Sequence, residues 1–162
     1  MPSAEPAAAS EPLVSKTTCT YWNPLDGEQQ HRWRWLEGLE GQVEELILSH
    51  DSTTGEFTRL TRFHPGSDTS SFGATVHAYP EEILIVSGRL WDAAFGMWLD
   101  TGHYASRPSG EVHGPFRSDA GCVVLDVSFP QRQDHGVDLS PEKCNRERMA
   151  ALNLVEPHGY DQ

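Results

Sequence analysis

The chain has 162 residues and a formal net charge of -12 at pH 7, from 24 acidic and 12 basic side chains. This length suits one domain with a substantial apolar core, and is short for two independent domains. Proteins that bind phosphate backbones depend on clustered Lys and Arg, so the acidic balance argues against nucleic acid or an anionic membrane as a partner.

The N-terminal sequence and the apolar content indicate where the protein is located, and the cysteine pattern argues against disulfides and zinc–thiolate sites. No apolar stretch approaches the roughly 20 residues of a membrane span, and the N-terminus lacks the regions of a signal peptide. We therefore expect a cytoplasmic protein. Cys19, Cys122 and Cys144 are odd in number and have no CxxC spacing, which predicts neither a disulfide framework nor a zinc–thiolate site.

Composition divides the chain into four segments. Residues 1–15 are rich in Pro, Ala, Ser and Glu and predict a disordered arm. Residues 16–42 hold tryptophans among Gly, Asn and Pro turns, and predict an aromatic-rich flap that packs on the body or covers a ligand. Residues 43–130 contain the strand-like runs, and residues 131–162 turn polar. A Ser-Pro-Glu start predicts a helix over about 141–154 in this last segment.

Short runs rich in β-branched and aromatic residues fill residues 43–130, separated by turn sequences such as STTGE, HPGSD and RPSG. The runs are VEELILS, FTRLTRF, SFGATVHAY, EEILIVSGRLW, GMWLDT, HYASRPSG and GCVVLDVSF. About seven strands at spacings near ten residues, with no helix between them, predict an all-β fold: an antiparallel sandwich or barrel.

The first stretch with chemical content is TVHAYPEE. Side chains alternate along a strand, so Thr75 and His77 are expected on one face. After the Tyr-Pro turn, Glu81 opens the next strand and can lie beside His77, which makes an imidazole and a carboxylate two ligands of a mononuclear site. Glu82 must point to the opposite face of a regular strand, so only one of the two glutamates can be a ligand, and the spacing to Gly88 favours Glu81.

The second stretch runs from Gly102 to His113 and reads as a strand, a Pro/Gly turn and a histidine that starts another strand. His113 could supply a third ligand. Tyr104 and Arg107 precede the turn and could bind substrate, Arg107 by pairing with a carboxylate or enolate oxygen. A surface ion pair for Arg107 and core packing for Tyr104 are the alternatives. Trp98 could form an apolar wall for the substrate, although barrel cores also need such residues.

These two stretches resemble the paired motifs of the cupin superfamily. His77, Glu81 and Gly88 stand at the intervals of the first motif. The second motif is matched by Gly102, Pro108, Gly110 and His113. The resemblance implies an RmlC-like jelly-roll barrel and a divalent metal held by His77, Glu81 and His113. The stretches EEILIVSG, RPSGEVHGPF and GCVVLDV are most similar to cupins of anti-sigma factors and to dioxygenases that cleave β-diketones and hydroxyacetophenones.

The sequence departs from the cupin pattern at three positions. Thr75 replaces the first histidine of the pair, Thr69 replaces the opening glycine, and Arg117 replaces the final asparagine. Two histidines and a carboxylate still form a facial triad of the kind that binds ferrous iron. Alternatively, the site is weakened and normally empty. His64 and His103 are the candidates for a replacement fourth ligand.

The first hypothesis, which the resemblance implies, is an enzyme: a mononuclear non-haem iron dioxygenase or a related metal-dependent cupin acting on a small enolisable carbonyl or phenolic compound. Fe(II) is the expected metal. Zn, Ni and Mn are the alternatives, and zinc or nickel would favour isomerase, lyase or cyclase chemistry.

The second hypothesis is a non-catalytic sensor or binding module, and a metal-free epimerase-like cupin is the weakest of the three. Sensor cupins carry a zinc-binding helical domain before the cupin, whereas the first forty residues here hold only Cys19 and His31 of the His and Cys ligands such a domain needs. Cupins commonly pair through their sheets, so a homodimer is expected.

Overall fold

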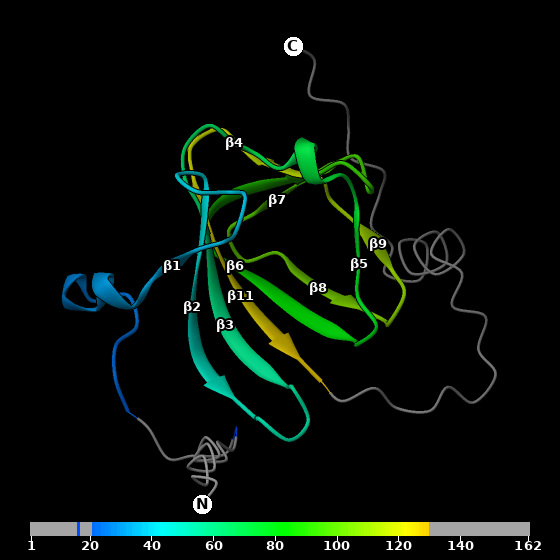
Figure 1. Ribbon diagram of the computed structural model, residues 1–162. Coiled ribbons are helices and arrows are strands. Elements are labelled where there is room, and N and C mark those ends of the chain that lie inside the picture. The colour runs from blue at the N-terminus through cyan, green and yellow to red at the C-terminus, as the bar shows by residue number, and fades with distance from the viewer. Residues whose placement is uncertain (1–15, 17–20, 130–162) are drawn as a thin grey trace, which may run out of the picture.

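The chain folds into a strongly curved antiparallel sheet, which Figure 1 shows as a half-open barrel. The computed structural model describes residue 16 and residues 21–129. The all-β jelly-roll prediction is confirmed by this architecture. The predicted arm over residues 1–15 and the predicted helix over about 141–154 lie outside the described residues. Within the described ranges, no helix has the length and apolar content needed to cross a membrane.

The described elements are short. Two 3-10 helices are present, η1 (Gly27–Arg32) and η2 (Ser70–Phe72). The strands are β1 (Arg34–Trp35), β2 (Val43–His50), β3 (Phe57–Phe63), β4 (Ser67–Asp68), β5 (Thr75–Val76), β6 (Glu81–Asp92), β7 (Met97–Asp100), β8 (Tyr104–Arg107), β9 (Val112–His113), β10 (Phe116–Ser118) and β11 (Cys122–Ser128).

The longest strand, β6, organises the sheet. The strand order is β1-β2-β3-β11-β6-β10-β4, with β7 and β8 also pairing with β6, while β5 and β9 form a separate two-stranded sheet. The first half of β6 pairs with β11 and β8, and its second half pairs with β10 and β7. Because one strand serves both walls, its bend folds the sheet around an interior.

Gly88 lies at this bend. Its φ of 75° belongs to the left-handed region that favours glycine, and a Cβ at this position would overlap the carbonyl oxygen of Gly121. The glycine at the first-motif interval therefore allows the backbones of β6 and β11 to meet closely at the corner.

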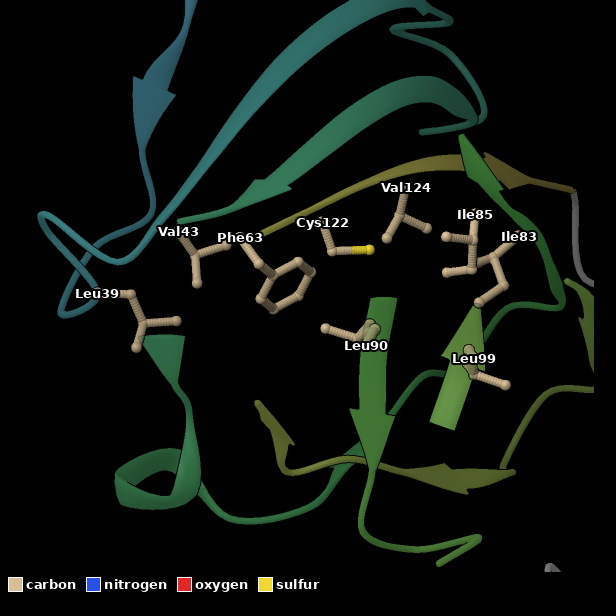
Figure 2. Packing of buried hydrophobic residues seen from close by; sticks show 9 residues of the cluster. All are labelled: Leu39, Val43, Phe63, Ile83, Ile85, Leu90, Leu99, Cys122 and Val124. Carbon is tan, nitrogen blue, oxygen red and sulfur yellow. The ribbon is translucent and has the colours of Figure 1, made fainter. Parts of the chain in front are cut away.

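Side chains alternate between the interior and the outer face of the walls. On β11, Cys122, Val124, Asp126 and Ser128 are buried, and the residues between them are half-buried. Figure 2 shows the interior cluster converging from several strands and from the flap. Its members are Leu39, Val43, Phe63, Ile83, Ile85, Leu90, Leu99, Cys122 and Val124. On the outer face, Trp33 packs with Leu46 and Leu60.

One predicted run forms less strand than expected. SFGATVHAY contains the end of η2 and the two-residue β5, and His77 follows β5 instead of lying inside a strand. Gly73 ends η2 with a φ of 73°, and Pro80 lacks the N–H that a continued strand would donate. The segment is therefore mostly a loop, which crosses the barrel opening.

Candidate metal centre

The curved sheet and the flap enclose a cavity of about 360 Å³. Apolar side chains line much of it, including Leu36, Leu39, Val43, Phe63, Phe72 and Phe116. Polar side chains line the remainder: Glu37, Arg59, Thr61, Thr69, Thr75, His77, Glu81, Arg107, His113 and Asp126. The cavity thus combines an apolar region with a set of charged and metal-ligating groups.

Three predicted site residues meet at one point of this wall. His77 follows β5, Glu81 is the first residue of β6, and His113 is the last residue of β9. The antiparallel pairing of β5 with β9 sets Thr75 opposite His113 and so brings the His77 loop across the opening. One ligand atom from each of the three residues lies within 4.8 Å of the other two.

The spacing of these atoms fits one divalent ion. The Nε2 atoms of His77 and His113 are 3.2 Å apart. Glu81 Oε1 lies 3.7 Å from Nε2 of His113, and Glu81 Oε2 lies 3.9 Å from Nε2 of His77. Two ligand atoms about 2.1 Å from one ion lie roughly 3.0 Å apart at a right angle and roughly 3.4 Å apart in a tetrahedron. The two imidazole nitrogens already satisfy this, and the Glu81 carboxylate has to move closer to both of them before one of its oxygens can share the ion.

The His113 imidazole is held in a form that can bind metal. Nδ1 of His113 lies 3.2 Å from the carbonyl oxygen of Glu111. Because a carbonyl oxygen can only accept a hydrogen bond, Nδ1 carries the proton and donates it. The lone pair on Nε2 is then left for an ion. Burial, with the charges of Arg107 and His77, lowers the pKa of His113 to about 3. Burial also lowers the pKa of His77, whose ring stacks on Tyr79 with centroids 4.7 Å apart. Both pKa shifts favour the neutral imidazole, which is the form that binds metal.

Glu81 shares its carboxylate with a buried guanidinium. Arg107 Nη1 donates to Glu81 Oε1 at 2.9 Å, and its Nη2 donates to Asp92 Oδ2 at 3.4 Å. Asp92 Oδ1 accepts from the backbone N–H of Gly114 at 2.8 Å and of Ala94 at 3.1 Å. Burial raises the pKa of Asp92, and Arg107 opposes that shift. Glu81 Oε2 therefore stays available to an ion.

The substrate roles predicted for three residues need correction or revision. Tyr104 is 59% exposed on the outer face, where it pairs with Leu84, and it does not line the cavity. Trp98 packs edge-on against Trp91 outside the cavity, with centroids 5.6 Å apart. Both positions follow from alternation, because the neighbouring residues Ala105 and Leu99 are the ones that pack with the interior core. Arg107 does line the cavity, but its described ion pairs commit it to Glu81 and Asp92.

Neither proposed fourth ligand reaches the centre. His64 Nε2 lies 2.9 Å from Glu44 Oε1, and His103 Nδ1 contacts the backbone of Asp100 in the turn before β8. Neither residue lines the cavity. Over residue 16 and residues 21–129, the candidate cluster consists of His77, Glu81 and His113 alone.

Sequence reasoning missed a second polar group in the cavity. Arg59 Nε and Thr61 Oγ1 donate to Asp126 Oδ2 at 2.9 Å and 2.6 Å, and Arg59 Nη1 donates to Glu45 Oε2 at 2.9 Å. Burial raises the pKa of Asp126, and Arg59 opposes the shift. The signal was present in GCVVLDVSF: a carboxylate in an apolar run, in phase with the inward residues Cys122 and Val124.

A jelly roll with a His, Glu and His cluster at its opening defines a cupin. Within that superfamily, residues 27–130 match the family described as the ChrR cupin-like domain, and the chain belongs to this family. The superfamily resemblance of the sequence is thereby confirmed. No curated protein matches the sequence.

Solved structures share the fold at low sequence identity. Acetylacetone dioxygenase from Acinetobacter johnsonii is 15% identical with a TM-score of 0.55, covering 83% of this chain and 95% of that one. KdgF from Halomonas sp. is 18% identical with a TM-score of 0.53, covering 72% and 98%. A protein of unknown function from Rhizobium leguminosarum is 17% identical with a TM-score of 0.50, covering 70% and 99%. At such identities these likenesses show the fold alone.

Proposed function

We propose that this cupin is a metal-dependent enzyme, a mononuclear non-haem iron dioxygenase or a related activity, acting on a small enolisable carbonyl or phenolic compound. The observation that carries the proposal is the convergence of His77, Glu81 and His113 on one point of the cavity wall. A divalent ion held there would supply Lewis acidity, and iron would add redox chemistry with dioxygen.

The residues of the chain support this activity in distinct ways. His77 and His113 present neutral nitrogen donors, and Glu81 brings one negative charge, so the donor set leaves positions open around a six-coordinate ion. Leu36 and Leu39 of the flap line the cavity, which limits access of water to a bound ligand. The apolar lining favours a substrate whose body is hydrocarbon and whose oxygens face the three donors.

A sensor or binding module is the second candidate, and one contact favours it. Arg107 neutralises Glu81 through a buried ion pair, and Thr75 stands where cupins have another histidine. Both features weaken the hold on a cation, as reversible occupancy would require. Zinc or nickel in the same site would favour isomerase, lyase or cyclase chemistry instead.

Metal analysis of the protein, purified without chelators or affinity metals, tests the proposal. We expect about one metal ion per chain, with iron as the main element. His113→Ala should lose it, whereas Glu82→Gln should keep it, because Glu82 pairs with Ser106 on the outer face. A His113→Ala variant with full metal content would remove His113 from the centre.

Oxygen uptake with β-diketones and hydroxyacetophenones separates the candidates. Consumption that depends on bound iron supports a dioxygenase. Stoichiometric zinc without oxygen uptake supports non-redox chemistry, and metal-free protein supports a binding module. The homodimer and the cytoplasmic location stay predictions, which sedimentation and cell fractionation can check.

A further inference from the structure

The cavity holds a carboxylate that the metal centre does not use. Asp126 lies on β11 and lines the same cavity as the three ligand candidates. Its partner on β6 is Ile83, while Glu81 pairs with Ser128, so Asp126 and Glu81 are diagonal neighbours on the inner face. Such neighbours lie roughly 7–8 Å apart or somewhat less. Asp126 is absent from the group of ligand atoms within 4.8 Å of one another.

The Asp126 carboxylate is held in one orientation. Arg59 Nε and Thr61 Oγ1 both donate to Oδ2, and the described contacts include no hydrogen bond to Oδ1. Oδ1 is also not among the described side-chain atoms that are sealed from solvent without a partner. An acceptor oxygen beside the cavity, fixed from behind by a cation and a hydroxyl, is arranged to receive a hydrogen bond from a ligand.

We propose that Asp126 is a specificity-determining residue, which accepts a hydrogen bond from a hydroxyl or amino group of the ligand at the metal centre. The inference rests on the proposed function and deepens it. The ligand class is a small chelating compound with a largely apolar body. It carries a hydrogen-bond donor about one aromatic ring away from its metal-binding oxygens, a length that follows from the diagonal spacing of Asp126 and Glu81.

A purely structural role explains the network less well. A buried ion pair costs desolvation that a well-packed apolar pair of similar volume avoids, so it contributes little net stability. Here the pair lines the cavity beside the apolar side chains of Val124 and Ile83, which line it as well. The raised pKa of Asp126 is consistent with a carboxylate that gains from a donor.

Cobalt-loaded protein allows ligand binding to be measured without turnover. The probes are ortho-hydroxyacetophenone, its relative with a second hydroxyl para to the acetyl group, and the methyl ether of that second hydroxyl. All three present the same chelating oxygens, and only the second adds a donor. Titrations follow the visible absorption of bound Co²⁺ and, independently, the heat of binding.

The wild-type chain should bind the dihydroxy probe roughly tenfold more tightly than the other two, since a hydrogen bond to a charged acceptor gives at least that factor. Asp126→Asn should abolish the difference while leaving Co²⁺ binding and the ortho-hydroxy probe unchanged. Asp119→Asn, which removes the same charge from an exposed residue paired with Arg89, should keep the difference.

Two failures are distinguishable. Absence of Co²⁺ binding to the wild-type chain contradicts the metal centre itself and the inference with it. Co²⁺ binding with equal affinities for the three probes, or an unchanged preference in Asp126→Asn, contradicts only the role of Asp126. Circular dichroism checks folding. If Asp126→Asn does not fold, Asp126→Glu keeps the charge beside Arg59 but shifts the oxygens, and it should also lose the preference.

Discussion

Arg107 donates a 2.9 Å hydrogen bond from Nη1 to Oε1 of Glu81, so a candidate metal ligand is already paired with a buried cation. The same guanidinium reaches Asp92, whose other oxygen accepts the backbone N–H groups of Gly114, before β10, and of Ala94, after β6. Arg107 thus connects the first and last residues of β6. The pair orients Glu81 and also competes with any ion for its charge.

Arg107→Met should separate these two effects. In metal-free protein, loss of the cation leaves the carboxylates of Glu81 and Asp92 buried without their guanidinium partner, and we expect destabilisation of roughly 3–5 kcal/mol. Added Zn²⁺ should then stabilise the variant more than it stabilises the wild type, because a competing positive charge is gone. Urea unfolding with and without Zn²⁺ measures both terms. Equal stabilisation by Zn²⁺ in the two chains would show that Arg107 does not compete.

Thr75 is a position where a ligand can be added. It lines the cavity and pairs with His113 across β5 and β9. Thr75→His should restore a four-ligand set and raise the apparent affinity for Zn²⁺ by on the order of tenfold or more. Competition with a chromogenic chelator measures this. Thr58→His places an imidazole on the outward-facing side of β3 and should leave the affinity unchanged.

His113 should give the metal-free protein a distinct acid sensitivity. Burial lowers its pKa to about 3, so between pH 6.5 and pH 3 the unfolded chain takes up a proton that the folded chain refuses. The free energy of unfolding therefore falls as pH falls through this window. With EDTA present, the wild type should lose about 2 kcal/mol more than His113→Gln between pH 7.5 and pH 5. Parallel losses in urea titrations of the two chains would contradict the low pKa.

Substitution of Gly88 should destabilise the protein through steric overlap, and a comparison with Gly66 separates this effect from the cost of a left-handed backbone. Gly88 and Gly66 both have positive φ, of 75° and 80°, but a Cβ at Gly66 meets nothing within 4 Å. Gly66→Ala should cost about 1–2 kcal/mol for the left-handed backbone. Gly88→Ala adds the overlap with Gly121 and should cost more than about 3 kcal/mol or prevent folding. Similar midpoints of urea unfolding for the two variants would show that the close contact between Gly88 and Gly121 does not matter for stability.

The location of the centre was predictable because it follows from local rules. Strand alternation puts Glu81 and Glu82 on opposite faces, and the resemblance to the two cupin motifs singles out His77 and His113. The second polar group was not predicted, although Asp126 shares the inward phase of its strand. Its partners Arg59 and Thr61 belong to β3, more than sixty residues earlier, and only the pairing of β3 with β11 brings them together.

The amino-acid sequence by itself determined the fold class, the positions of the longer strands and the three ligand candidates, because hydrophobic period, turn residues and motif spacing are local properties of the chain. Only the tertiary structure decided which face of β7 and β8 points toward the cavity. Arg107 lines the cavity, whereas Trp98 and Tyr104 lie outside it. It also decided that Arg107 pairs with Glu81 and Asp92. Such outcomes depend on the register between distant strands, which no local pattern encodes.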